Sequence, residues 1–133
     1  MSNLLFDSLF QRHYGNEKPF LIFVDGSKQS YNSFLRQTAR FANTIQSLGL
    51  SAGDRLLVQI EKSPESLAVY AACVQSGVIF LPLNTAYTPN EVSYFIADSG
   101  AKLVIADTSS NLSSVAKRHG VILESLDASG NGS

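Results

Sequence analysis

The sequence predicts an α/β domain in which helices cover both faces of a mostly parallel sheet, preceded by a short N-terminal hairpin. Apolar runs of strand length alternate along the chain with segments whose apolar residues recur every three or four positions. Glycines follow three of the predicted helices, at Gly49, Gly77 and Gly100, as expected for helix C-termini. This alternation is typical of βαβ units, whose strands pair in parallel.

The chain of 133 residues has room for one domain. We expect residues 1–126 to form the α/β subdomain. Residues 127–133 are mostly Gly, Ser and Asn and carry no helix or strand pattern. We therefore expect this last segment to be a disordered tail.

The composition argues against several classes of protein. Ten Lys and Arg residues oppose eleven Asp and Glu residues without any basic block, so a nucleic-acid or anionic-membrane partner gains no electrostatic support. No apolar run approaches the roughly 18 residues of a membrane span, and the N-terminus does not resemble a secretory signal. The single cysteine cannot form an internal disulfide. We expect a cytoplasmic protein with neither a nucleic-acid nor a membrane partner.

The N-terminal part predicts a helix followed by a hairpin. Residues 3–14 favour an amphipathic helix, because one stripe at helical spacing is apolar: Leu5, Phe6, Leu9 and Phe10. Residues 20–24 predict a strand and residues 27–30 a returning strand. Asp25 and Gly26 between them are typical of a tight hairpin turn.

A second helix is predicted to begin after Ser30, whose hydroxyl suits the N-cap position. Apolar residues then recur at every third or fourth position up to Leu48, and Gly49 occupies the place of a C-terminal cap. Residues 51–54 form the predicted turn into the next strand.

The central segment predicts strand, helix and strand in succession. Residues 56–60 form a short apolar run, and residues 67–74 form a helix that is apolar on nearly every side. The helix ends are marked by Ser63 at the N-cap, Pro64 at the first position and Gly77 at the C-terminus. Residues 78–81 begin the following strand. A helix without a polar face requires cover on several sides.

The last third has the clearest helix start in the chain. Thr88 and Glu91 form a capping box around Pro89, and Tyr87 with Val92 forms a hydrophobic staple. Three further elements follow: a strand at 103–106, a helix at 111–119 and a strand at 121–123.

The central segment also resembles a known family. Residues 77–88, GVIFLPLNTAYT, resemble the early motif of the AMP-forming acyl-CoA synthetases, in which a helix ends at glycine and a strand leads into Pro-Leu-Asn. Residues 61–65, EKSPE, and residues 94–98, YFIAD, resemble the malonyl-CoA synthetase branch. The similarity extends more weakly from about Leu4 to Gly132.

The resemblance implies an ATP-dependent acid–CoA ligase, which converts malonate, ATP and CoA into malonyl-CoA, AMP and pyrophosphate. The motifs of that chemistry are absent from the sequence: a Ser/Thr/Gly-rich phosphate loop with its lysine, a Tyr-Gly-x-Thr-Glu stretch, the ribose-binding aspartate and the lysine of a mobile lid. We therefore assign no catalytic, cofactor-binding or metal-binding residue to this chain.

The resemblance instead implies an incomplete N-terminal subdomain of a larger ligase, inactive alone. ATP, Mg²⁺ and coenzyme A are implied for the full-length family only. The implied partner is the remainder of the ligase domain, in cis or in trans, which would cover an apolar helix or sheet face left open here.

Three other interpretations stay open at this point. In the first, the chain is a self-sufficient α/β binding module. In the second, it is a scaffold or interaction subunit of a separate ligase polypeptide. Within the same reaction class, acetate, an aryl acid or a fatty acid would replace malonate.

Several positions resemble functional residues without a motif to support them. Residues 107–111 follow a predicted strand, as a phosphate-binding loop would, but they include no glycine and have no lysine nearby. We interpret them as an ordinary loop with an N-cap. Residues 130–132, Gly-Asn-Gly, are only a weak signal of a phosphate-binding loop. His13 and His119 are predicted near helix C-termini, where the dipole favours a cation. Cys73 is predicted to be a core residue.

The carboxyl ends of two predicted strands carry the remaining candidates, because ligands of parallel sheets bind at that edge. Glu61 and Lys62 follow the first strand and are interpreted as a solvated turn of opposite charges. Asn84, Thr85 and Tyr87 lie on the loop after the second strand. Tyr87 is explained by its place at the start of the next helix, whereas the role of Asn84 stays open.

Overall fold

The computed structural model describes residues 4–10, 13–22 and 25–126, so the predicted tail at 127–133 lies outside the described residues. The elements in chain order are α1 (Leu4–Leu9), β1 (Pro19–Ile22), β2 (Lys28–Ser30), α2 (Tyr31–Ser47), β3 (Arg55–Gln59), α3 (Pro64–Ser76), β4 (Ile79–Pro82), α4 (Pro89–Ser99), β5 (Leu103–Ala106), α5 (Ser113–His119) and β6 (Ile122–Ser125). None of the helices described here has the length and apolar content needed to cross a bilayer.

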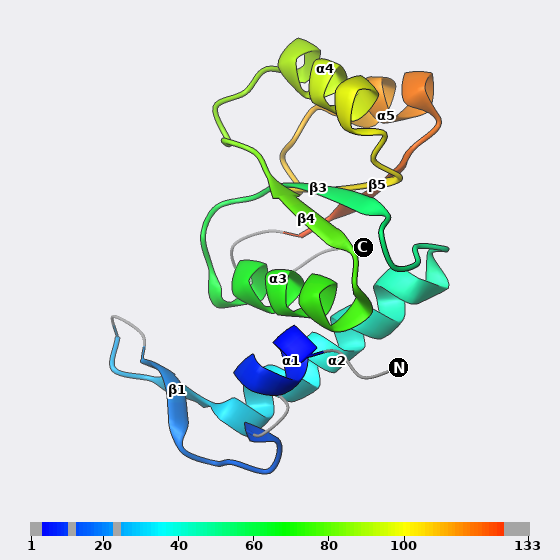
Figure 1. Ribbon diagram of the computed structural model, residues 1–133. Coiled ribbons are helices and arrows are strands. Elements are labelled where there is room, and N and C mark those ends of the chain that lie inside the picture. The colour runs from blue at the N-terminus through cyan, green and yellow to red at the C-terminus, as the bar shows by residue number, and fades with distance from the viewer. Residues whose placement is uncertain (1–3, 11–12, 23–24, 127–133) are drawn as a thin grey trace.

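Two sheets form, and both were predicted. Strands β4, β3, β5 and β6 lie side by side in that order, and every pair is parallel. Strands β1 and β2 form a separate antiparallel hairpin beside the start of α2 (Figure 1). Helices α2 and α3 cover one face of the parallel sheet, whereas α4 and α5 cover the other (Figure 1). The predicted fold class is confirmed.

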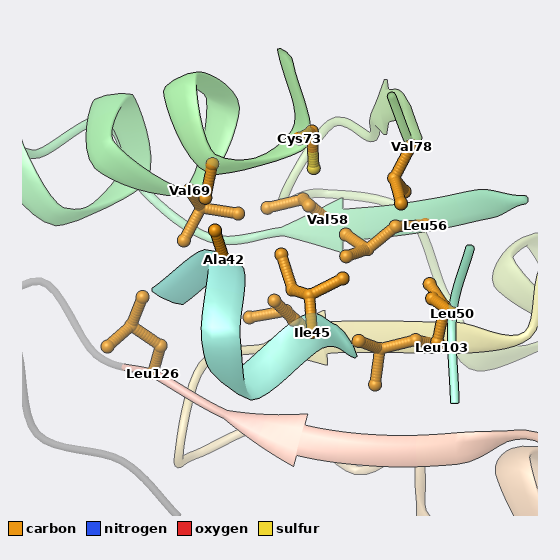
Figure 2. Close-up of a cluster of buried hydrophobic side chains, with 12 residues drawn as sticks. Ala42, Ile45, Leu50, Leu56, Val58, Val69, Cys73, Val78, Leu103 and Leu126 are labelled. Atoms are coloured by element: carbon orange, nitrogen blue, oxygen red, sulfur yellow. The ribbon is translucent and has the colours of Figure 1, made fainter. Parts of the chain in front are cut away.

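Alternating side chains of the central strand β3 build the two cores. Leu56 and Val58 face α2 and α3, where they pack among Ala42, Ile45, Val69, Cys73 and Leu103 (Figure 2). Leu57 faces the opposite way and packs with Val104 of β5, Val92 and Ile96 of α4, and Val115 of α5. Because both faces of β3 are buried, its middle residues, Leu56, Leu57 and Val58, form a continuous apolar run between Arg55 and Gln59.

The ends of α3 follow the predicted local chemistry. The Ser63 hydroxyl accepts a hydrogen bond from the Ser66 amide at 3.0 Å, and the Ser66 hydroxyl oxygen accepts one from the Ser63 amide at 2.9 Å. Gly77 closes the helix with a φ of +72°, a conformation that favours glycine. The predicted capping box at Thr88 and Glu91 of α4 is likewise confirmed.

Helix α3 is covered on two sides and open on a third. Its small residues Ala68, Ala71 and Ala72 are buried against neighbouring helices and the sheet. An apolar hollow of about 430 Å³ remains beside β4, and we call it the apolar groove. Its apolar lining residues are Val58, Ile60, Leu67, Tyr70, Phe80, Pro82 and Leu83. Tyr70 stays 37% exposed, so the described residues do not enclose the helix.

The first helix is shorter than predicted, and half of its predicted apolar stripe is wrong. Helix α1 ends at Leu9, and Leu5 and Leu9 are 54% and 45% exposed. Only Phe6 and Phe10 are buried, in a cluster with Phe34 of α2. Residues four apart share a helix face, whereas adjacent residues lie about 100° apart, so α1 buries only one of the two pairs.

The last helix also begins later than predicted. Helix α5 starts at Ser113 rather than 111, and its N-cap residue is the buried Leu112, which makes no side-chain capping bond. The N-cap predicted within Asp107 to Asn111 is therefore wrong. The final strand covers Ile122–Ser125 instead of 121–123, because its register follows pairing with β5.

Candidate functional site

A polar cleft of about 500 Å³ lies at the carboxyl ends of β3 and β5. Its walls are the loop between β4 and α4 and the loop between β5 and α5. The residues lining it include Gln59, Glu61, Thr85, Tyr87, Asp107 and Ser109. Parallel sheets bind ligands at this edge, so the polar cleft is the candidate site.

Gln59 holds one wall of the polar cleft in place. Its side chain ends β3, and the residue is only 7% exposed. The Nε2 group donates hydrogen bonds to the backbone oxygens of Asn84 at 3.0 Å and Tyr87 at 3.1 Å. Two carbonyl acceptors require the amide nitrogen at that end, which leaves Oε1 as the free acceptor. Within the described ranges Oε1 has no hydrogen-bond donor.

The role of Gln59 is absent from the sequence-based prediction. The available signal was a polar residue interrupting the apolar run of β3. A buried polar side chain needs hydrogen-bond partners, and here these lie 25 and 28 residues away.

The loop after β4 is organised mainly by its own hydrogen bonds. Asn84 Oδ1 accepts from the Ala86 amide at 2.8 Å, and its backbone oxygen accepts from the Tyr87 amide at 3.1 Å. Tyr87 packs in the cluster that contains Val92 and stacks on Phe95, with ring centroids 5.2 Å apart. This geometry agrees with the predicted staple. Asn84, left open by the sequence, is a turn residue, while Thr85 is exposed on the cleft wall.

The opposite wall presents a carboxylate. Asp107 Oδ1 accepts hydrogen bonds from the Ser109 hydroxyl at 2.6 Å and the Ser109 amide at 2.9 Å. These bonds lower the pKa of the Asp107 carboxyl below its usual value, so the group is ionised at neutral pH. The loop therefore uses its amide and hydroxyl donors on its own carboxylate.

Glu61 and Lys62 point into different hollows. Glu61 lines the polar cleft, whereas Lys62 lines the apolar groove beside α3. In the described part of the chain neither residue forms an ion pair. The adjacent charges are both exposed, as expected of a solvated turn, but they belong to separate surfaces.

The histidines and the cysteine have structural surroundings. His13 lies beyond the end of α1, in a 3₁₀ turn, and its ring stacks on that of Tyr31 with the ring centroids 4.1 Å apart. His119 does lie in the last turn of α5, where Nε2 is 2.7 Å from Ser93 Oγ. Burial raises the pKa of the Cys73 thiol to about 12, and Cys73 is a core residue as predicted.

Metal-ligating side chains do not gather within the described ranges. No group of three or more His, Cys, Asp or Glu residues there has an arrangement that could hold an ion.

Comparison with known proteins identifies the family. A family model described as AMP-binding enzyme matches residues 10–131. The chain belongs to the AMP-binding enzymes. Among curated AMP-binding relatives, the feruloyl-CoA synthase of Amycolatopsis sp is 35% identical over 80 residues, covering 60% of this chain and 16% of the relative. The acetyl-coenzyme A synthetase of Cronobacter sakazakii is 36% identical over 76 residues, covering 57% and 12%.

A solved structure of this family is similar along the whole chain. Apo MatB from Rhodopseudomonas palustris, a malonyl-CoA synthetase, superposes with a TM-score of 0.92 at 38% identity. The match covers 100% of this chain and 27% of MatB. The chain thus matches the N-terminal subdomain of a ligase in fold. It spans about a quarter of MatB and less than a fifth of the two curated relatives.

Proposed function

We propose that the chain serves as the N-terminal subdomain of an ATP-dependent ligase that joins malonate to coenzyme A. The observation that supports malonate is the likeness to MatB over the entire chain at 38% identity. The curated relatives carry names with different acids, ferulate and acetate among them. The choice of malonate therefore rests on the structural likeness.

Within such a ligase, the role we propose for these residues is scaffolding. The sheet ends on both sides with a strand that has only one neighbour among the described residues, β4 and β6. Two apolar surfaces adjoin those edges. One is the apolar groove beside β4, and the other is a hollow of about 150 Å³ near β6 lined by Phe41, Ile45, Leu48, Ile105 and Leu126. Further protein packed on these surfaces would gain hydrophobic free energy.

The polar cleft does not fit a nucleoside triphosphate. Its lining carries the carboxylates of Glu61 and Asp107 and no Lys, Arg or His. Phosphate binding requires free backbone amides and cations, whereas the Ser109 amide already donates to Asp107. We propose that Mg·ATP and coenzyme A, which supply acyl-adenylate and thioester chemistry, bind protein segments other than these. A cytoplasmic location completes the proposal.

A segment exchange tests this function. The part of MatB that matches this chain is replaced by the 133 residues, and malonate-dependent pyrophosphate release is measured with ATP. The matched control places the same residues in the benzoate CoA ligase of Burkholderia xenovorans, which is only 21% identical over this region. We expect release with malonate from the MatB exchange, and much weaker benzoate-dependent release from the control.

Two results would contradict the proposal. One is a folded MatB exchange without pyrophosphate release. The other is malonate-dependent pyrophosphate release by the 133-residue chain alone, because a scaffold has no adenylation activity of its own.

A further inference from the structure

We propose that the apolar groove receives an amphipathic helix from the rest of the ligase, and that an acidic residue of this helix pairs with Lys62. This partner rests on the proposed function, because only a chain that is part of a larger ligase has such a segment.

The apolar groove is a surface that the described residues leave open. Apart from Lys62 and two serines, every residue that lines it is apolar, and the two serines bond each other in the capping box of α3. Tyr70 of α3 is 37% exposed, although its ring packs edge-on against Phe80 of β4 with the ring centroids 5.4 Å apart. Covering this surface with further protein removes apolar area from water, so the groove suits an apolar partner.

A single cation stands at one end of the groove. Lys62 lies one residue before the N-cap of α3, and no other lining residue is charged; Glu65, in the first turn of α3, does not line the groove. Within the ranges that the structure describes, Lys62 has no ion pair. Covering the groove would take its ammonium group out of water, which is costly unless a carboxylate accompanies it. A partner with an Asp or Glu at that end therefore complements the groove.

The edge of the sheet favours a helix over an added strand. In β4 the amides of Ile79 and Leu83 bond toward β3, so Phe80 and Pro82 face outward. Pro82 has no N–H, which leaves Phe80 as the outward donor of this strand. An added strand would therefore gain few hydrogen bonds here. A helix satisfies its own backbone groups and needs only an apolar stripe to dock in a groove.

The length of the groove sets the size of the partner. Its residues on α3 extend from the N-cap Ser63 to Tyr70, which corresponds to about 10 Å along the helix axis. A partner helix lying alongside α3 covers this distance with about two turns, using apolar residues at positions i, i+3 or i+4, and i+7. Lys62 then lies opposite one end of that stripe, where we place the acidic residue.

Photocrosslinking in the MatB exchange tests this partner. Tyr70 is replaced by p-benzoylphenylalanine, and the peptide captured on irradiation is identified by mass spectrometry. We expect capture, within one polypeptide, of a segment from outside the 133 residues that has apolar residues three and four positions apart and an Asp or Glu. The matched control places the same photoreactive residue at Tyr94, an exposed aromatic position on α4, and should not capture that segment.

Charge reversal tests the pairing with Lys62. We expect Lys62→Glu to lower the yield of this crosslink about three-fold, and replacement of the captured acidic residue by Lys to restore the yield in the same polypeptide. The control Lys28→Glu reverses a charge at an exposed position on β2 and should leave the yield unchanged. Gel filtration before irradiation establishes which variants are folded.

Four outcomes with a folded exchange would overturn the proposal. Three concern the captured peptide: no capture, capture of a second copy of the polypeptide, or capture of a segment that lacks an acidic residue or whose apolar residues alternate as in a strand. The fourth is an unchanged yield in Lys62→Glu.

These outcomes differ from failure of the proposed function. An exchange that crosslinks as expected but releases no pyrophosphate with malonate contradicts that function alone. An active exchange without the crosslink contradicts the docked helix alone, and an exchange that does not fold contradicts both.

Discussion

Replacing Gln59 with Met should loosen the wall of the polar cleft and destabilise the fold. Met has nearly the same length and volume, so the change mainly removes the amide that bonds Asn84 and Tyr87. Asn84 O keeps the Tyr87 amide as a donor at 3.1 Å, whereas Tyr87 O keeps no donor among the described residues. Two hydrogen bonds are lost, and one of these losses strands the Tyr87 carbonyl, which together corresponds to about 2–3 kcal/mol of unfolding free energy.

Urea unfolding of the purified chain gives this free energy, and hydrogen exchange locates the change. We expect the Tyr87 amide to exchange faster in Gln59→Met, because the loop loses its attachment to β3. The control is Gln46→Met, the same chemical change at an exposed position on α2, which should alter stability by at most about 0.5 kcal/mol. Equal effects of the two substitutions would refute the assigned role of Gln59.

Three further predictions concern other parts of the fold. Gly77→Ala should lower the free energy of unfolding in urea by more than Gly53→Ala does. Both glycines have a positive φ, but only at Gly77 would the added β-carbon lie 3.1 Å from a neighbouring one, that of Ala52. Equal losses of unfolding free energy in the two variants would contradict this. Cys73 should resist alkylation at pH 8 until urea unfolds the chain. Burial raises the pKa of the Cys73 thiol from 9.0 to about 12, so with rising pH the thiol ionises in the unfolded chain before it does in the folded one. The free energy of unfolding should therefore fall as the pH rises between those values, and Cys73→Ala should reduce this dependence on pH. The chain should self-associate through the apolar groove, and light scattering should show that Tyr70→Glu raises the dissociation constant of the self-associated form about ten-fold. The control Tyr94→Glu, at an exposed position on α4, should leave that constant unchanged. A wild-type chain that stays monomeric at every concentration would contradict the prediction.

The features that sequence alone could predict depend on residues near one another in the chain. Ser63 and Thr88 cap their helices through partners three positions away, so their roles are visible as short motifs. Gly77 ends α3 for an equally local reason, its positive φ. The parallel sheet also followed from local signals, because apolar runs bounded by such caps have few ways to pack.

The features that the sequence did not predict depend on packing between distant segments. Which pair of α1 residues is buried depends on Phe34 of α2, so Leu5 and Leu9 were misassigned. Gln59 acquires its role from a loop 25 residues further along. Glu61 lines the polar cleft and Lys62 lines the apolar groove. The sequence could not predict this difference, because it depends on where α3 and the β5–α5 loop lie.

The two outer strands of the parallel sheet are unequal as templates for a further strand. In β4 the amides of Ile79 and Leu83 bond toward β3, so the intervening even-numbered positions face outward, and one of those is Pro82, which has no N–H. In β6 the amides of Ile122 and Leu126 bond toward β5, which leaves Leu123 between them with an outward N–H group. Lateral growth of the sheet, whether by correct assembly or by aggregation, is therefore expected to proceed from β6.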